Sequence, residues 1–150
     1  MEKAININSE AEMISLGEKI GELAVPDMVI ALNGDLGAGK TTLTKGIGKG
    51  LGIYDIINSP TFTILKIYYG RLVLYHFDVY RLDEESGDDY LEEYFYLGGI
   101  SVIEWAKNIA YLLPKEYLMI EIKIVNDSYR KVIFYANSPQ YISFIERVLL

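Results

Sequence analysis

The spacing of apolar residues changes several times along this chain, and each spacing predicts a different element. Between Met13 and Leu23, apolar residues recur at intervals of three and four, which predicts an amphipathic helix. Ser9 lies just before this pattern, and Glu12 follows three residues later, which is the S-x-x-E spacing of a capping box. The chain is therefore expected to enter its first helix at Ser9 and to leave it at about Ala24.

β-branched and aromatic residues gather in further short segments, which predict strands. Four of these segments form two pairs, each joined by a short turn, and predict two antiparallel hairpins. Two other short runs are largely apolar, as is typical of strands that are covered on both faces. The hairpin segments are 64–69 with 71–80 and 117–125 with 129–136, and the apolar runs are 28–32 and 100–104.

Three more helices are expected between and after these strands. One covers residues 40–49, one covers WAKNIAYLLP and stops before Pro114, and one follows a Ser138-Pro139 cap. In the first of these helices, Gly46 and Gly48 each cost roughly 1 kcal/mol relative to Ala. Packing or a ligand must therefore help to hold that helix.

Length and composition indicate one globular domain over residues 1–150, in which 51% of the residues are hydrophobic. Signals for parallel and antiparallel strands occur together. The expected fold is therefore an α/β sandwich, a mixed parallel/antiparallel sheet with helices on both faces.

Charge and cysteine content narrow the functional classes. Lys and Arg number 14 against 21 Asp and Glu, a formal net charge of −7. Since phosphate neutralisation supplies most non-specific affinity for nucleic acids, any RNA contact is expected to be made by another protein. The absence of Cys excludes disulfides and thiolate metal sites. We see no apolar run near the roughly 20 residues of a membrane span and no secretory h-region, so a cytoplasmic location is expected.

The stretch NGDLGAGKTTLT (33–44) has the G-x-x-x-x-G-K-[ST] spacing of a phosphate-binding loop, or P-loop. Its glycines would let the backbone approach phosphate and turn N–H groups toward it. Lys40 would reach the β- and γ-phosphates, and the Thr41 hydroxyl would ligate magnesium. Thr42 lies in the first helical turn, where an anion is favoured. With a strand before it and a helix after it, the motif predicts Mg-nucleotide binding by a P-loop NTPase-like fold.

A nucleotide-bound magnesium ion usually has an acidic partner in P-loop enzymes, and two predicted strands end in one. Asp78 ends LVLYHFD and Glu104 ends ISVIE, at the edge where ligands of α/β sheets collect. Either carboxylate could instead cap nearby N–H groups, and the residues alone do not decide which one faces the metal. His76 shares a strand face with Asp78, so it could orient that carboxylate or be a structural histidine.

Two further features stay open on the residues alone, and a third has a simple interpretation. Ser59-Pro60-Thr61-Phe62 could order when γ-phosphate and metal bind, or could be an ordinary loop with Phe62 in the core. Arg81 could complement phosphate charge or form a salt bridge. The acidic run 83–89 is expected to be a solvated surface.

Four motifs in this order, GDLGAGKTT, SPTFT, HFDVYRL and VIEW, resemble the bacterial TsaE (formerly YjeE) family, from Ser9 to about Arg130. One motif alone would indicate only a P-loop, but four in order are highly specific. The resemblance implies a small ATPase that works with TsaB, TsaD and the separate enzyme TsaC to make threonylcarbamoyl-adenosine beside the anticodon of tRNA. It implies binding to the TsaB–TsaD dimer, with tRNA reached only through that complex. ATP hydrolysis would then support repeated turnovers rather than the transfer itself.

The resemblance also implies roles for single residues. Thr41 and Glu104 would ligate magnesium, Asp78 would activate or position water, and Thr61, with Ser59, would lie in a switch-like segment near the γ-phosphate. The implied ATP-binding residues are Gly37, Ala38, Gly39, Lys40, Thr41 and Thr42 around the phosphates, with Ser9 and Arg130 toward the adenine.

Contacts with partners are implied as well. Trp105 is expected near a nucleotide-dependent interface. The aromatic segment 87–99 fits either a partner surface or core packing. A rival function is a nucleotide-gated assembly factor, in which ATP binding rather than hydrolysis matters. The sequence has no N-K-x-D motif of a Ras-type GTPase, and its four arginines are scattered, unlike the Arg-rich lid of a small-molecule kinase.

Overall fold

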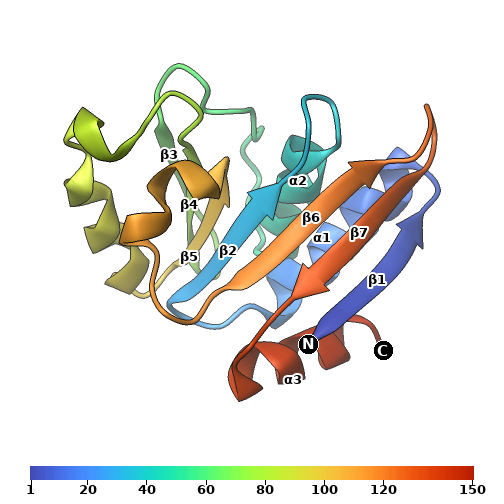
Figure 1. Ribbon diagram of the computed structural model, residues 1–150. Helices are drawn as coiled ribbons and strands as arrows, with labels where there is room; N and C mark the ends of the chain where they lie inside the picture. The colour runs from blue at the N-terminus through green and yellow to red at the C-terminus, as the bar shows by residue number, and fades with distance from the viewer.

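Seven strands form one mixed sheet in the order β1-β7-β6-β2-β5-β4-β3 (Figure 1). The structure is a computed structural model that describes residues 1–150. β6, β2, β5 and β4 are parallel neighbours, while β7 and β1 on one side and β3 on the other pair antiparallel. The strands are β1 (Glu2–Ile7), β2 (Met28–Asn33), β3 (Leu65–Tyr69), β4 (Val73–Asp78), β5 (Ile100–Glu104), β6 (Leu118–Ile124) and β7 (Arg130–Tyr135). Both predicted hairpins and both predicted apolar strands are confirmed. β1 was not predicted, since this edge strand is mostly exposed and has no strong apolar alternation.

Helices cover both faces of the sheet, as expected, but the two faces differ in helix type. Three α-helices lie on one face and 3-10 helices on the other (Figure 1). The predicted helix before Pro114 is confirmed, and it is a 3-10 helix with a kink at Ile109. The α-helices are α1 (Glu10–Leu23), α2 (Lys40–Gly50) and α3 (Pro139–Val148), and the 3-10 helices are η1 (Glu84–Ser86), η2 (Asp89–Tyr96) and η3 (Ala106–Leu112).

The two faces of β2 explain why its sequence is apolar throughout. Met28, Ile30 and Leu32 point into the larger core, which α1, α2 and α3 cover. Val29 and Ala31 point into the smaller core beneath η2 and η3. Because side chains alternate along a strand, two buried faces require an uninterrupted apolar run. A strand this deeply buried holds the loop that follows it at a fixed place.

Glycines let α1 and α2 touch backbone to backbone. A Cβ at Gly17 would collide with the carbonyl of Leu43, and a Cβ at Gly46 would collide with the carbonyl of Ile14. A Cβ at Gly48 would collide with the side chain of Ile57. Close packing thus offsets the low helix propensity of α2, as was expected from its glycines. The same packing fixes the position of this helix, whose first residue is Lys40.

The predicted caps are partly confirmed. Ser9 Oγ accepts a hydrogen bond from the Glu12 N–H at 3.1 Å, as in a capping box. The reciprocal half of the prediction is wrong, because the Glu12 carboxylate accepts from the N–H of Asn8 at 2.7 Å, one residue before the cap. Ser138 caps α3 as predicted, and its Oγ accepts from the Tyr141 N–H. No helix in the structure combines the length and hydropathy needed to cross a membrane.

Candidate functional site

The glycine-rich loop joins β2 to α2 at the carboxyl edge of the parallel strands. Gly37 and Gly39 have φ values of 81° and 116°, a left-handed region that other residues rarely adopt. The N–H groups of Gly39, Lys40 and Thr41 donate to no acceptor within the protein. Free N–H groups at a helix N-terminus, next to left-handed glycines, form an anion-binding concavity.

Lys40, the first residue of α2, folds back over this loop. Its ammonium donates to the backbone carbonyls of Gly34 and, at 3.4 Å, Asp35. The same nitrogen lies 4.3 Å from the centre of the Trp105 ring. Burial lowers the pKa of Lys40 below its ordinary value of 10.5, although nearby Glu104 and other carboxylates oppose the shift. A partly dehydrated cation without a carboxylate in direct contact is well suited to meet phosphate.

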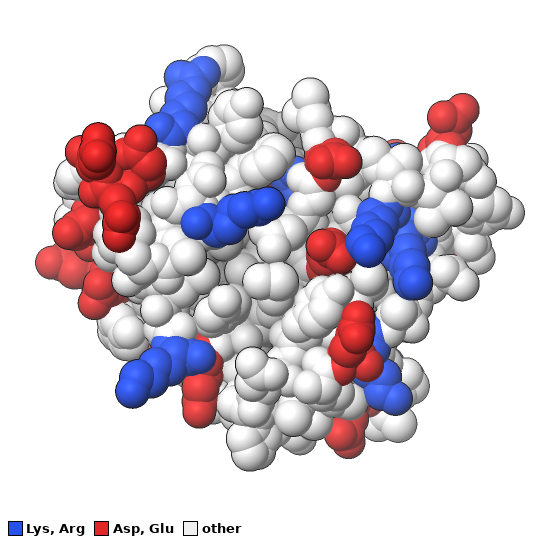
Figure 2. Space-filling view, in the orientation of Figure 1, with Lys and Arg blue, Asp and Glu red and all other residues white.

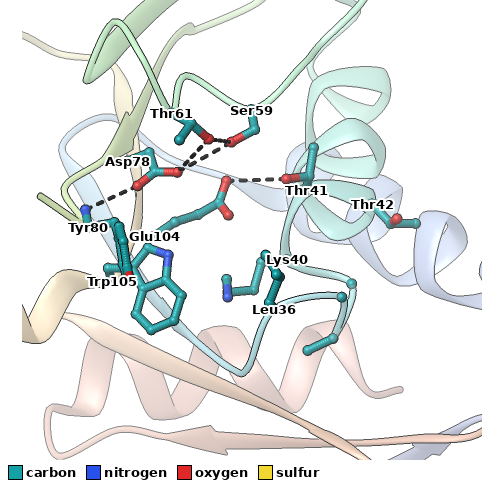
Figure 3. A pocket seen from close by; sticks show the side chains of 13 residues that line it. Leu36, Lys40, Thr41, Thr42, Ser59, Thr61, Asp78, Tyr80, Glu104 and Trp105 are labelled. Carbon is teal, nitrogen blue, oxygen red and sulfur yellow. Dashed lines mark hydrogen bonds between the residues drawn. The ribbon is translucent and has the colours of Figure 1, made fainter.

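Asp78 and Glu104 lie side by side, because they are register partners at the ends of the parallel strands β4 and β5. Both side chains face α2, and their residues are only 6% and 3% exposed. Two carboxylates and Lys40 therefore share one partly closed space (Figure 3). The sequence places both acids at this edge, and the structure brings them together opposite the P-loop.

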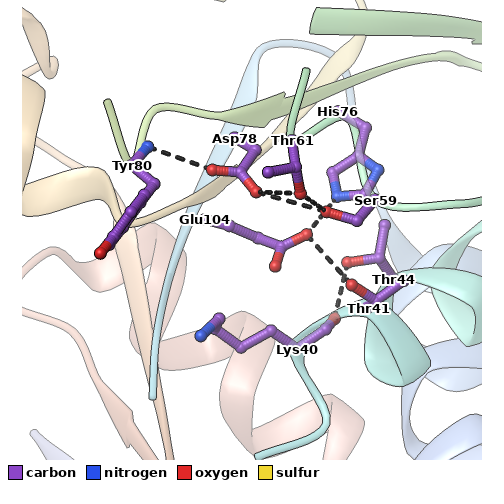
Figure 4. A network of polar contacts seen from close by, with 9 residues as sticks. All are labelled: Lys40, Thr41, Thr44, Ser59, Thr61, His76, Asp78, Tyr80 and Glu104. Atoms are coloured by element: carbon purple, nitrogen blue, oxygen red, sulfur yellow. Dashed lines mark hydrogen bonds and ion pairs between the residues drawn. The ribbon is translucent and has the colours of Figure 1, made fainter. Parts of the chain in front are cut away.

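Glu104 is held by two side chains from different elements (Figure 4). Its Oε2 lies 2.6 Å from Nε2 of His76 and accepts a hydrogen bond from the Thr41 hydroxyl at 3.4 Å. The suggestion that His76 orients Asp78 is therefore wrong. His76 pairs with Val102 across the β4–β5 register, so Glu104 is its diagonal neighbour on the same face.

Asp78 is held instead by a loop. Its Oδ2 lies 3.3 Å from Ser59 Oγ and 3.2 Å from Thr61 Oγ1, and these two hydroxyl oxygens lie 2.7 Å apart, so the hydroxyl pair shares two hydrogens among three contacts. Its Oδ1 accepts from the Tyr80 N–H at 3.1 Å (Figure 4). The suggestion that Phe62 packs in the core is wrong, because Phe62 is 84% exposed. The segment from Ser59 to Thr61 thus reaches the site through hydroxyl groups rather than through apolar packing.

Arg81 forms a cation–π contact in place of the salt bridge that the sequence suggested. Its guanidinium carbon lies 5.1 Å from the centre of the exposed Phe62 ring. Arg81 is not among the residues that line the cavity beside the P-loop, and its suggested role toward phosphate stays a prediction.

A cavity of about 550 Å³ lies between the P-loop and the two strand ends (Figure 3). Leu36, Tyr80 and Trp105 form its apolar side, and the rings of Tyr80 and Trp105 lie 4.9 Å apart. Trp105 has φ of 63°, an uncommon value for a non-glycine residue. Sequence reasoning missed Leu36 and Tyr80, although both lie inside quoted motifs. The other residues that line the cavity are Gly37, Ala38, Gly39, Lys40, Thr41, Thr42, Ser59, Thr61, Asp78 and Glu104.

A second cavity of about 480 Å³ lies on the other side of the P-loop and includes Ser9, Thr42 and Arg130. The guanidinium of Arg130 donates to the carbonyls of Ala38 at 2.9 Å and Gly37 at 3.3 Å. The structure therefore brings Ser9 and Arg130 to the P-loop, but to the opposite side from Glu104. Arg130 ties the loop to the β6–β7 hairpin.

The donor groups near Thr41 fit magnesium better than a softer metal. The cavity offers a hydroxyl oxygen and carboxylate oxygens, the hard ligands that Mg²⁺ prefers. No group of three or more His, Cys, Asp or Glu residues could hold a metal by itself. A magnesium ion here would need phosphate oxygens and water, as is usual when it arrives with a nucleotide.

The acidic run forms an exposed surface, as expected. Figure 2 shows acidic side chains gathered on the left of the view, where Figure 1 places η1 and η2, while Lys and Arg are scattered. In the aromatic segment that follows, Phe95 is 2% exposed and packs in the smaller core, whereas Tyr90 and Tyr96 are more than half exposed. Core packing accounts for only part of this segment.

Known proteins are similar to this chain in sequence and in fold. The family model described as "Threonylcarbamoyl adenosine biosynthesis protein TsaE" matches residues 7–132. A Bacillus subtilis protein named "tRNA threonylcarbamoyladenosine biosynthesis protein TsaE" is 48% identical over 136 residues, which cover 90% of this chain and 85% of that protein. A Treponema pallidum protein of the same name is 43% identical over 118 residues, which cover 77% and 87%. The crystal structure of Bacillus subtilis YdiB matches with a TM-score of 0.87 and 39% identity, covering 99% of this chain and 94% of that one.

Proposed function

Because the chain belongs to the TsaE family of threonylcarbamoyl adenosine biosynthesis proteins, we propose that it is a magnesium-dependent ATPase serving this modification of tRNA. One observation carries the proposal: the P-loop, with Lys40 and Thr41, faces Glu104 and Asp78 across a single cavity of about 550 Å³. A cation, free N–H groups and two carboxylates in one cavity are the parts that phosphoryl transfer to water requires.

In this proposal the loop binds the phosphates before any bond is broken. The free N–H groups of Gly39, Lys40 and Thr41 donate to phosphate oxygens. Lys40 exchanges the carbonyl of Gly34 for the β- and γ-phosphates, where its charge is worth more than beside a neutral carbonyl. Ser9 and Arg130 line the second cavity, where the adenine is proposed to lie.

Thr41 and Glu104 are the proposed protein ligands of the metal. The Thr41 hydroxyl donates its hydrogen to Glu104, which leaves oxygen lone pairs of Thr41 available to a cation. Bound magnesium would neutralise charge on the transferred phosphoryl group. Glu104 would contribute a negative charge from the end of a buried strand and so would help to hold the ion beside the P-loop.

Asp78 is the proposed group that positions the attacking water and receives its proton. The hydroxyl groups of Ser59 and Thr61 lie beside its Oδ2, so this pair must move before a water can bind there. A switch-like movement of this segment upon γ-phosphate binding would release that oxygen. Turnover is expected to be slow until the segment moves.

The proposed partners are the TsaB and TsaD homologues of the same organism, acting in the cytoplasm, with tRNA reached only through that complex. The net charge of −7 supports an indirect route to tRNA. Trp105 supports coupling of nucleotide and partner, because it lies against Lys40 and also on the apolar side of the cavity. ATP hydrolysis would reset the TsaB–TsaD complex between turnovers.

The occupied Oδ2 of Asp78 also favours a second candidate, a nucleotide-gated assembly factor in which binding alone matters. In that case a variant that binds ATP without hydrolysing it, Asp78→Asn, would support full tRNA modification. If hydrolysis matters, the same variant would support at most about one modification per complex.

The experiment that tests the main proposal is ATP turnover with and without the TsaB and TsaD homologues. We expect the isolated protein to turn over ATP slowly, and the rate to increase strongly when both partner proteins are present. Lys40→Met should show neither the slow turnover nor the increase. Absence of magnesium-dependent hydrolysis under both conditions would overturn the ATPase proposal.

A further inference from the structure

His76 is a fully buried residue to which the proposed reaction gives no role. It is 0% exposed and lies on β4 between Leu74, in the core, and Asp78, in the site. Its only hydrogen-bond partner is Glu104, whose Oε2 lies 2.6 Å from Nε2 (Figure 4). The second ring nitrogen, Nδ1, is buried and has no partner.

The contact with Glu104 uses only one of the two ring nitrogens. A carboxylate can only accept, so Nε2 donates a hydrogen bond to Oε2. Nδ1 is left without a hydrogen-bond partner. An unpaired buried polar atom destabilises the fold, and an apolar side chain of similar size would avoid this cost. Packing alone therefore does not account for a histidine at this position.

The two oxygens of Glu104 have different surroundings. Oε2 receives both protein donors, Nε2 of His76 and the more distant Thr41 hydroxyl. Oε1 has no hydrogen-bond partner in the protein, and Glu104 lines the cavity. The short bond from His76 therefore holds the carboxyl group in the rotamer that turns its other oxygen toward the nucleotide space.

We propose that His76 is a positioning residue that acts through Glu104, fixing Oε2 with one hydrogen bond so that Oε1 is presented to the metal. The inference rests on the proposed function, in which Glu104 binds magnesium. Residues behind a metal ligand orient it and raise its affinity for the ion. His76 would touch neither nucleotide nor metal, and its effect should be confined to magnesium-dependent binding.

Two variants of similar length separate this role from packing. His76→Gln keeps a donor that can occupy the place of Nε2, whereas His76→Met removes the donor and keeps an unbranched side chain. ADP affinity is measured by calorimetry over a series of Mg²⁺ concentrations and in EDTA. This readout needs no turnover, and thermal unfolding of each free protein checks the fold.

In His76→Met we expect the half-saturating Mg²⁺ concentration to rise by about 10- to 100-fold, with ADP affinity in EDTA unchanged within about twofold. His76→Gln should stay within about threefold of the wild type in both. Equal Mg²⁺ titrations for wild type and His76→Met would overturn the inference and leave the proposed function intact. So would an equal loss of ADP affinity in Mg²⁺ and in EDTA, which would indicate a structural role.

A wild-type protein that binds ADP with no dependence on Mg²⁺, or not at all, would overturn the proposed function and the inference together. If His76→Met does not fold, His76→Asn takes its place, because its shorter amide cannot reach Glu104. A double-mutant cycle is completed by two further variants, His76→Gln/Glu104→Ala and His76→Asn/Glu104→Ala. Without Glu104, Gln and Asn at position 76 should give equal Mg²⁺ titrations, and a remaining difference would show that His76 acts by another route.

Discussion

The ends of β4 and β5 carry the two buried carboxylates of the molecule, and the two are held in different ways. Glu104 at the end of β5 rests on His76 and Thr41, which belong to a central strand and to the first turn of a packed helix. Asp78 at the end of β4 rests on hydroxyl groups of the loop residues 59–61. Neighbouring acids of the same chemistry are thus held in one case by a strand and a packed helix and in the other by a loop.

This difference indicates how the site can divide its work. A metal ligand gains affinity when its position is fixed before binding, whereas a group that handles water must be released at one step of a cycle. Support by a strand and a packed helix suits Glu104 to the metal, and the loop support suits Asp78 to a step that waits for nucleotide. The comparison can be tested by changing either acid, the side chains that hold it, or the Lys40 cation that faces both.

The largest effect is expected from the cation that faces both acids. Lys40→Met keeps the length of the side chain but removes the only ammonium in the cavity, so ATP turnover should fall at least about 100-fold. Turnover is measured with saturating Mg²⁺ and the partner proteins present. Unchanged ATP affinity and turnover would show that the phosphate site lies elsewhere. Lys45→Met, at an exposed position of the same helix, is the control and should behave as the wild type.

A strong but narrower effect is expected on the β4 side. Asp78→Asn keeps the size of the side chain and removes its basicity, so turnover should fall by about 10²- to 10⁴-fold. ADP affinity should change little, because Asp78 is not proposed to bind phosphate or metal. Comparison of single-turnover rates with calorimetric affinities checks this, and a parallel loss of both would remove the distinction between the two acids.

A smaller effect is expected when the loop support of Asp78 is weakened. Thr61→Val removes one hydroxyl of the pair beside Oδ2, together with its contact to Ser59, and leaves the Ser59 hydroxyl free to donate to Asp78. The change is worth about 1 kcal/mol, or roughly fivefold. If the contacts restrain Asp78, turnover of the isolated protein should rise, whereas a fall would show that Thr61 assists the reaction directly. Thr63→Val, in the same segment but outside the cavity lining, is the matched control.

The smallest effect at neutral pH concerns the protonation of Lys40. Burial lowers the pKa of this ammonium below 10.5, and only the protonated form attracts phosphate. ATP affinity should therefore begin to fall, as pH rises, at a pH below that of an ordinary lysine. In Lys40→Arg the guanidinium stays charged throughout, so its affinity, although altered by shape, should not fall over the same range. Calorimetric titrations in alkaline buffers distinguish the two curves.

Much of the fold follows from residue patterns. The apolar runs of β2 and β5 and the two hairpins are visible because burial and register impose strict spacing. The edge strand β1 was missed because a mostly exposed edge leaves a weak pattern. The helix before Pro114 was predicted, but its 3-10 geometry and the non-helical backbone at Ile109 were not, since residue spacing does not distinguish helix types over so short a segment.

The site also has some features that the sequence predicts and others that it does not. The P-loop and the two strand-end acids could be found from spacing, because backbone geometry brings strand ends to one edge. The partner of His76 could not, since it depends on which strand lies beside β4 and in which register. The exposure of Phe62 and the contacts of Arg81 were also out of reach, because loop conformation is decided by hydrogen bonds to Asp78.

The central claim is that Glu104 is the metal ligand and Asp78 is not. It is tested most directly by titrating Mg²⁺ against ADP affinity in two isosteric variants, Glu104→Gln and Asp78→Asn. The account predicts that Glu104→Gln raises the half-saturating Mg²⁺ concentration by at least about tenfold, while Asp78→Asn matches the wild type within about threefold. A shift in Asp78→Asn with none in Glu104→Gln would contradict the account and reverse the two roles.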